Sequence, residues 1–357
     1  MAAKDQSQKV MEIADVGQAI AWQARHAEEA GAPITGRIIR AEAAIIAADT
    51  QTGRRMASWP GLSLEDAMPL RVAGALHFLH LTGATDALAP VYAGKVTDQA
   101  EVDALVAGVA RDFDAALLPW LDGPPQTNEA GRSASVMAGL LWLGERLCPR
   151  FELIEIGASA GINTMMHRYG YRLGGVKAGI TDSPMQIVPE WRGTPPPAGP
   201  VEIVGVKGCD IAPVDLTDPA QAQRLKAYIW ADARDRMARM DVAIALATAQ
   251  PPDLVQMDAA AFVAERLAAD QPAGVSRVLF HTVMWQYLPQ ATRAAIRAMM
   301  EEAGAKATPE RPLAWLRVET NRATFRHELT VKFWPGGDKV TLLAEAHPHG
   351  AWVRWLG

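Results

Sequence analysis

Glu155-Ile-Gly-Ala-Ser-Ala-Gly161 follows a short apolar run and precedes a helical pattern, and this stretch decides the fold that the sequence predicts. A glycine-rich turn that joins a strand to a helix presents backbone N–H groups to a ligand. We therefore expect a cofactor-binding turn in a Rossmann-like domain, with a strand over residues 151–156 and a helix over 160–168.

The chain changes character near Pro149, just before this turn. From residue 8 to about 148 apolar residues recur at helical spacing, Ile38 and Ile45 among them, and no strand is predicted. After Pro149 short β-rich runs alternate with helical stretches, which is typical of parallel sheets. Strands are predicted at about 151–156, 201–207, 253–257, 277–283, 312–318, 325–334 and 338–346. Helices are predicted at 160–168, 217–248 with a break, 259–269 and 289–303.

These patterns predict an α/β protein with two domains. Residues 1–148 form a helical domain, able to cap a site or bind substrate, that ends in a helix at 129–147 capped by Asn128. Residues 149–357 form a Rossmann-like domain of methyltransferase type with a seven-stranded sheet, and Pro335-Gly-Gly-Asp338 turns its terminal hairpin. Glycines and prolines at about 170–200 mark an excursion from the alternating order.

Composition narrows the possible functions. The 357 residues carry a net charge of −5 with dispersed basic side chains, so nucleic acid is not an expected partner. The two cysteines and the His77/His80 and His347/His349 pairs lack ligand spacing, and no metal is expected. The amino terminus is polar and no apolar run could span a bilayer, which predicts a cytoplasmic protein without a membrane partner.

The opening stretch is open to two chemical interpretations. Gly157-Ala-Ser-Ala-Gly161 matches G-x-S-x-G, the nucleophile elbow of serine hydrolases, and His327, His347 and His349 are late histidines that a triad could use. No His-Gly-Gly-Gly-like segment precedes it, however. The strand that enters the turn is also the first of the sheet, whereas a hydrolase elbow follows several strands. Strand order therefore favours a cofactor turn.

Carboxylates at the ends of the next two predicted strands support the cofactor interpretation. Asp210 ends the second strand, where an acidic side chain accepts hydrogen bonds from ribose hydroxyls. Asp258, followed by Ala259, ends the third strand and could accept a hydrogen bond from an adenine amino group. Asp210 lies 53 residues after Gly157, against roughly 20 in the usual fingerprint. Asp182 is therefore the alternative ribose ligand, and both Asp210 and Asp258 could instead cap helices.

Several segments together resemble class I S-adenosylmethionine-dependent methyltransferases. They are Glu155–Gly161, Gly208-Cys-Asp-Ile-Ala-Pro213, Met257-Asp-Ala259 and Val278-Leu-Phe-His-Thr-Val-Met-Trp-Gln-Tyr-Leu-Pro289. More narrowly, Gln126-Thr-Asn-Glu-Ala-Gly-Arg-Ser133 and Tyr169-Gly-Tyr-Arg172 look like segments of a bacterial family of unassigned function. The last strand end lacks Asn/Asp-Pro-Pro-Tyr, which disfavours enzymes that methylate amides or bases on nitrogen.

The methyltransferase resemblance implies S-adenosylmethionine as cofactor. Its expected ligands are Glu155, Gly157, Ser159, Gly161, Asn163, Asp210, Asp258 and Ala259. Glu155 is expected near the methionine end, and Ser159 replaces the usual middle glycine, which a negative φ would allow.

Other polar and aromatic residues are candidates for contact with a small-molecule substrate. Asn128, Glu129 and Arg132 gather at one predicted helix start, as substrate ligands or as caps. Trp285 could shield the sulfonium, grip substrate or pack on the helical domain. His281 and Tyr287 are candidate catalytic groups, although His281 also fits a core position.

The resulting hypothesis is a methyltransferase that acts on a small molecule. A serine hydrolase that uses Ser159 and a non-catalytic protein that binds a nucleoside cofactor are the alternatives. Fold similarity alone does not specify a reaction. The acceptor and the oligomeric state do not follow from the sequence.

Overall fold

The computed structural model describes residues 15–60 and 66–357, and the chain divides into two compact units. The first combines the chain up to Thr127 with Gln223–Met237, and the second combines Asn128–Ala222 with Ala238–Gly357. The division that we predicted at residue 148 differs from these units in two places. The helix before residue 148 lies in the second unit, and residues 223–237 lie in the first.

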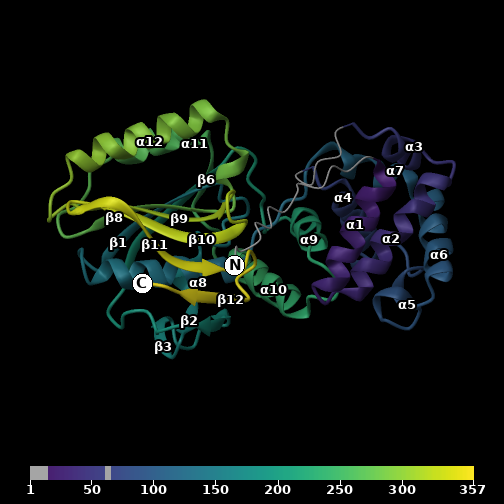
Figure 1. Cartoon of the computed structure of the whole chain (residues 1–357), viewed down its shortest axis with the longest axis horizontal. Coiled ribbons are helices and arrows are strands. Elements are labelled where there is room, and N and C mark those ends of the chain that lie inside the picture. Colours follow the sequence, from purple (N-terminus) through teal and green to yellow (C-terminus); the bar gives the residue numbers. More distant parts are fainter. Residues whose placement is uncertain (1–14, 61–65) are drawn as a thin grey trace, which may run out of the picture. The chain divides into compact units, whose positions relative to one another are not determined.

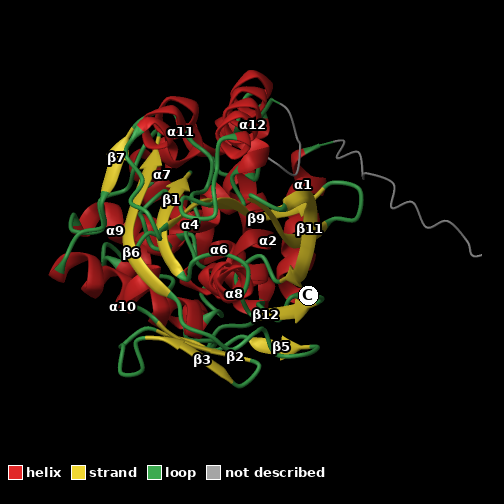
Figure 2. Ribbon diagram, turned by 90° about the vertical axis from the view of Figure 1, so that its left-hand side faces the viewer, coloured by secondary structure: helices red, strands yellow, loops and turns green. Residues whose placement is uncertain are grey.

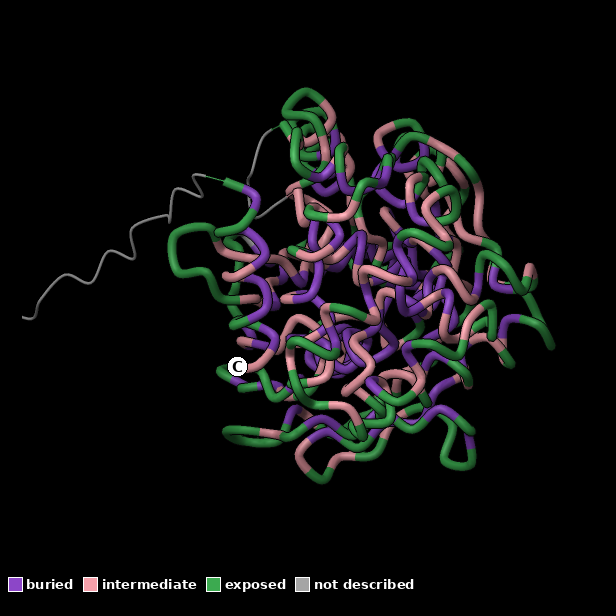
Figure 3. The backbone as a smooth tube through the Cα atoms, turned by 90° about the vertical axis from the view of Figure 1, so that its right-hand side faces the viewer, coloured by how far each residue is buried: buried purple, intermediate pink, exposed green. Residues whose placement is uncertain are grey.

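The first unit is helical, as its apolar spacing predicts (Figure 1). Its buried core includes Ile38, Ile39 and Ile45, and Figure 3 shows buried and exposed residues alternating along the helices. Asp232 ties in the segment 223–237, since its carboxylate accepts hydrogen bonds from the backbone N–H groups of Ile34 and Thr35, both at 2.9 Å. The helices are α1 (Val16–Glu29), α2 (Pro33–Ala47), α3 (Gln51–Ala57), α4 (Met68–Leu81), α5 (Ala89–Tyr92), α6 (Gln99–Asp112), α7 (Asp114–Leu117) and the 3-10 helix η1 (Leu118–Asp122).

The second unit contains a large, mostly parallel sheet of nine strands in the order β5-β12-β11-β10-β9-β8-β1-β6-β7. All seven predicted strands are present: β1 (Arg150–Ile156), β6 (Glu202–Asp210), β7 (Leu254–Gln256), β8 (Ser276–Thr282), β9 (Leu313–Asn321), β10 (Arg326–Trp334) and β11 (Gly337–Ala346). The predicted count of seven is wrong, because β12 (Trp352–Trp355) and β5 (Glu190–Arg192) extend the edge. These two strands are too short to show a periodicity in the sequence.

Helices cover both faces of this sheet (Figures 1 and 2). On one face α11 (Ala259–Ala268) and α12 (Gln290–Ala305) bury Phe262 and Ile296 in a cluster with Ile154 of β1. On the other face α8 (Ser133–Gly144) contacts β9 and β10, and Gly139 allows it to approach Leu316 closely. Helices α9 (Pro219–Ala227) and α10 (Arg234–Ala249) lie between β6 and β7 in the chain. In the described residues, no helix is long and apolar enough to cross a membrane.

The excursion at 170–200 forms a small sheet of three strands, β2 (Gly170–Leu173), β3 (Val176–Gly179) and β4 (Gln186–Ile187). It also contains β5, which belongs to the large sheet. The helix predicted at 160–168 is wrong, since turns lead there into the short 3-10 helix η3 (Met166–Arg168). In this segment, side chains form the hydrogen bonds to backbone groups that would otherwise pair with one another within a helix. Asn128 accepts a hydrogen bond from the N–H of Ile162, and Tyr169 donates one to its carbonyl.

Candidate functional site

The carboxyl end of β1 is the point where the chain changes direction in the sheet. From β1 the chain moves to β6 and β7 on one side, and it then crosses back to β8 on the other side. In open α/β sheets the loops on either side of such a point diverge and leave a crevice for ligands. The Gly157–Gly161 turn lies at this position.

The turn holds its residues in left-handed backbone conformations. The φ angles of Gly157, Ser159 and Gly161 are +65°, +53° and +71°. The φ of Ser159 is thus positive, so the condition under which serine would replace the middle glycine without strain is not met, and hydrogen bonds hold both sides of its backbone. Its N–H donates to Asp210 Oδ2 at 2.8 Å, and its carbonyl accepts from the N–H of Val214 at 3.1 Å. A side chain in this conformation costs roughly 1–3 kcal/mol.

The two predicted nucleoside-binding carboxylates both bind backbone groups. Asp210 accepts from Ser159 through Oδ2 and from the N–H of Ala212 through Oδ1, so it shapes the turn. Asp258 caps α11, because its Oδ1 accepts from the N–H groups of Ala260 and Ala261. An ionised carboxylate has about four lone-pair sites, so acceptor capacity remains on each.

Ala259 and Asp182 were the other residues considered for binding the nucleoside. Ala259 is the buried first residue of α11. Asp182, the alternative ribose ligand, is exposed between β3 and β4 of the small sheet and not at a strand end of the large one.

Glu155 is a buried carboxyl group at the end of β1. It is 1% exposed and accepts a hydrogen bond from Thr164 Oγ1 at 2.5 Å. Burial raises the pKa of Glu155 to about 8, a rise that the Thr164 hydrogen bond opposes and the charge of Asp210 reinforces. Glu155 is therefore mainly protonated at neutral pH, and a cationic ligand beside it would favour ionisation.

Buried polar atoms without a hydrogen-bond partner gather after β1 and on β8. In the part of the chain that the structure describes, they include Ser159 Oγ, both amide atoms of Asn163 and His281 Nε2. Asn163 and His281 have no exposed surface. A buried polar group left unpaired costs about 1–3 kcal/mol, and ligand groups could satisfy these atoms.

Side chains from flanking segments hold the turn in place. Asn128 Oδ1 accepts from the N–H of Ile162 at 2.9 Å, so the helix cap that we predicted for Asn128 is wrong. Helix α8 begins after the 3-10 helix η2 (Ala130–Arg132) without a side-chain cap. The Tyr169 hydroxyl donates to the carbonyl of Ile162 at 2.5 Å, and that of Tyr171 donates to Met166 at 2.9 Å. The Tyr-Gly-Tyr segment was visible in the sequence, but its structural role was not.

Glu129 and Arg132 are buried beside the segment 347–350. Glu129 Oε1 lies 3.8 Å from His349 Nδ1, and Arg132 Nε donates to the carbonyl of Pro348 at 2.7 Å. A Cβ on Gly350 would lie 2.2 Å from the backbone of Gly131, so the two segments are in direct contact. The groups that we predicted as substrate ligands thus join η2 to the carboxyl-terminal part of the sheet unit.

The loop after β8 is organised by Glu319, a residue that the sequence did not suggest. Its Oε1 lies 2.6 Å from His281 Nδ1 and accepts from the N–H groups of Met284 and Trp285 at 3.1 and 3.3 Å. Val283 is held in a left-handed conformation with a φ of +53°. Glu319 lies one residue beyond the predicted strand 312–318, and an isolated glutamate there gives no signal.

Aromatic residues and Met284 surround this loop. Trp285 of the 3-10 helix η4 (Trp285–Tyr287) stacks on His281 with ring centroids 4.9 Å apart. Met284 packs on the glycine turn, since a Cβ on Gly157 would lie 2.7 Å from its side chain. Tyr287 is 67% exposed, whereas His281 has no exposed surface.

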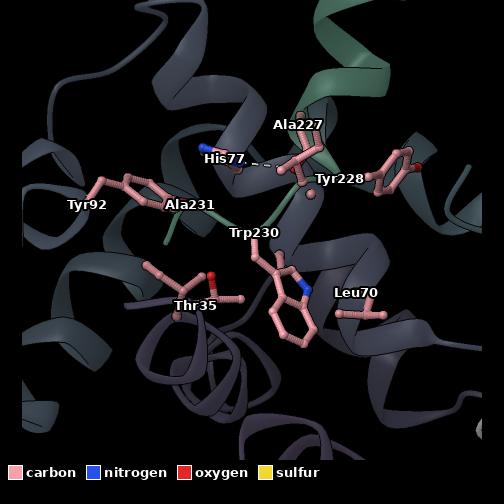
Figure 4. A pocket seen from close by; sticks show the side chains of 12 residues that line it. Thr35, Leu70, His77, Tyr92, Ala227, Tyr228, Trp230 and Ala231 are labelled. Atoms are coloured by element: carbon pink, nitrogen blue, oxygen red, sulfur yellow. Dashed lines mark hydrogen bonds between the residues drawn. The ribbon is translucent and has the colours of Figure 1, made fainter. Parts of the chain in front are cut away.

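A small pocket lies within the helical unit, bordered by His77, Tyr92, Tyr228 and Trp230 (Figure 4). His77 Nδ1 lies 3.1 Å from the carbonyl of Ala227, and burial lowers the pKa of His77 to about 4. The pocket volume of about 20 Å³ suits one water molecule, whereas small-molecule sites measure several hundred. Across residues 15–60 and 66–357, no group of three metal-ligating side chains is found.

Comparison with known proteins identifies a family. A family model described as "Uncharacterized protein conserved in bacteria (DUF2332)" matches residues 17–355. No curated protein and no solved structure matches the chain. The narrower resemblance, to a bacterial family of unassigned function, is thereby confirmed, while the methyltransferase resemblance stays a prediction.

Proposed function

We propose that this chain, which belongs to the DUF2332 family of bacterial proteins, binds S-adenosylmethionine at the carboxyl ends of β1, β6 and β7 and methylates a small molecule. The order of its five parallel strands supports this proposal. Numbered along the chain without the short excursion strands, β7-β6-β1-β8-β9 reads 3-2-1-4-5, as in nucleotide-binding doubly wound sheets. The antiparallel strands β10 and β11 continue the sheet differently from that fold.

The observation that carries the proposal is the set of unpaired polar atoms beside the glycine turn. Ser159 Oγ and the amide of Asn163 are buried without partners, and the amide can both donate and accept. The amino and carboxylate groups of the cofactor's methionine part would suit these atoms. Without a ligand, burying these unpaired atoms lowers the stability of the fold.

The remaining cofactor ligands follow from their strand ends. Asp210 would hold the ribose with its remaining acceptor capacity, and Asp258 Oδ2 would face the adenine amino group. Glu155 would lie near the cationic methionine end. Met284 lies against Gly157, so its flexible side chain has to move before a ligand reaches that residue.

The bound cofactor would supply an electrophilic methyl group. The residues of this chain would then contribute position and the exclusion of water, which account for much of the acceleration in such transfers. The turn and Asp210 orient the ligand, while the loop 283–287 borders the place where the acceptor would lie.

Titration calorimetry with S-adenosylmethionine and S-adenosylhomocysteine tests the proposal. We expect the wild-type protein to bind both, and Asp210→Ala to weaken binding at least tenfold. The matched control Asp182→Ala should bind like the wild type. Lack of binding to both ligands, in protein shown to be folded by circular dichroism, would reject the cofactor site, and binding without any methyl transfer would leave a non-catalytic binding protein.

A serine hydrolase is the second candidate, because Ser159 combines an elbow-like sequence with a strained φ of +53° and a free Oγ. Against it, no histidine lies within hydrogen-bond distance of Ser159 Oγ. A fluorophosphonate probe distinguishes the two functions. Labelling of the wild type that disappears in Ser159→Ala would replace the methyltransferase proposal.

A further inference from the structure

Buried His281 and half-buried Glu319 form a pair that the cofactor site itself does not need. His281 is the penultimate residue of β8, Glu319 lies near the end of β9, and the two strands are adjacent and parallel. His281 Nδ1 lies 2.6 Å from Glu319 Oε1, while His281 Nε2 is buried without a partner. Glu319 thus holds Nδ1 of the ring in place, whereas Nε2 has no partner among the described residues and could bind a ligand group.

The carboxylate sets the tautomer of the imidazole. A carboxylate oxygen accepts, so the proton of a neutral His281 lies on Nδ1 and the lone pair lies on Nε2. Glu319 also accepts from two backbone N–H groups, which fixes its orientation. A histidine oriented through one nitrogen by a carboxylate is the arrangement of a general base, and its complement is a hydrogen-bond donor.

We propose that His281 is the proton acceptor of this site, that Glu319 is its positioning residue, and that the substrate is methylated on a hydroxyl group. The inference rests on the proposed methyltransferase function. The substrate O–H bond breaks, its proton passes to the Nε2 lone pair, and its electron pair stays on oxygen as the nucleophile. This oxygen would bond to the cofactor's methyl carbon as the carbon–sulfur bond breaks, and the sulfur would keep that electron pair as the neutral thioether of S-adenosylhomocysteine. The imidazolium that forms is stabilised by the adjacent Glu319 carboxylate.

The loop 283–287 controls access to His281. The imidazole has no exposed surface and Trp285 stacks on it, so a substrate hydroxyl reaches Nε2 only after this loop moves. The left-handed conformation of Val283, a β-branched residue, makes the closed loop costly by roughly 1–3 kcal/mol. Opening the loop would release the strain at Val283, and this gain would partly offset the free energy lost when Trp285 leaves His281.

Nuclear magnetic resonance of protein labelled with ¹⁵N-histidine tests the arrangement without any substrate. We expect His281, assigned by its loss in His281→Gln, to carry its proton on Nδ1, and Glu319→Gln to weaken this preference. His26→Gln, on helix α1 of the helical unit, is the matched control and should leave the His281 signals unchanged. A His281 ring protonated on Nε2 alone would overturn the inference.

Methyl transfer from tritiated S-adenosylmethionine to a panel of small alcohols, phenols, thioethers and tertiary amines tests the substrate class. We expect transfer to hydroxyl groups, a rate lowered about 100-fold or more by His281→Gln, and a smaller loss in Glu319→Gln. Cofactor affinity, measured by calorimetry, should change less than about threefold in both variants. Undiminished transfer by His281→Gln, or transfer only to acceptors without a hydroxyl group, or none at all by protein that binds the cofactor, overturns the inference. Failure of cofactor binding rejects the proposed function instead.

Discussion

Glu42 in the helical unit and Glu155 in the sheet unit are both buried carboxyl groups, yet their surroundings differ. Glu42 on α2 has no exposed surface, and its carboxyl group meets the backbone of Ala73 but no side-chain donor among the described residues. Glu155 accepts from Thr164 and lies near the charges of Asp210 and Arg132. Burial raises the pKa of both groups, that of Glu42 well above its ordinary value.

The difference shows that burial of a charged residue type does not by itself indicate a functional site. Glu42 packs among apolar helices, where a protonated carboxyl group is simply tolerated at some cost in stability. Glu155 lies near the end of β1, the middle one of the five parallel strands β7-β6-β1-β8-β9, beside a strained turn and other unpaired polar atoms. The convergence of independent features at one strand end distinguishes the second position from the first.

The largest effect that we expect is a loss of stability as the pH rises. The unfolded chain releases the Glu155 proton near pH 4.5, whereas the folded protein retains it up to about pH 8. Stability is therefore highest below pH 4.5 for this group and decreases as the pH rises to about 8, by roughly 3–5 kcal/mol. Urea unfolding at pH 5, 6.5 and 8 measures this, and Glu155→Gln should remove that part of the slope.

Glu42→Met sharpens the comparison. It should flatten the same pH dependence, because the folded protein also retains the Glu42 proton, and it should leave S-adenosylhomocysteine binding unchanged. Glu155→Gln should alter both stability and binding. Equal slopes in the wild type and in a variant that combines Glu42→Met with Glu155→Gln would show that neither buried carboxyl group determines the pH dependence.

A smaller effect is expected at Ser159. Glycine adopts a φ of +53° without steric cost, whereas serine and alanine do not. We expect Ser159→Gly to be more stable than Ser159→Ala by about 1 kcal/mol, since both lose Oγ and only the first removes the strain. Thermal unfolding of the two variants measures the difference, and a more stable Ser159→Ala would show that the turn is not strained.

Much of the fold could be predicted because the large sheet has strong local signals. Helices α11 and α12 separate β7, β8 and β9 in the chain, their apolar residues recur at helical spacing, and the glycine turn lies where it was expected. The segment 160–168 was predicted as a helix, because the hydrogen bonds that keep it irregular come from Asn128 and Tyr169, and such contacts leave no local pattern. The strands β5 and β12 depend on pairing partners far along the chain.

The candidate site was only partly predictable, for the same physical reason. Residues at strand ends, such as Asp210, could be identified by type and position. The capping role of Asp258 was one of the two roles that the sequence offered, because its bonds to Ala260 and Ala261 are local. The φ of Ser159 and the bonds of Glu319 depend on hydrogen bonds that only the tertiary structure reveals. Tyr287 is exposed on η4, so the catalytic role predicted for it stays without a structural argument.

Asn163 offers the most direct test of the claim that the end of β1 is a ligand site. Its amide is buried without a partner, so Asn163→Leu removes an unsatisfied polar group of similar size and should preserve or increase stability. Titration calorimetry should show S-adenosylhomocysteine binding by the wild type and binding at least tenfold weaker by Asn163→Leu. Equal affinities, or no binding by the folded wild type, would contradict the claim.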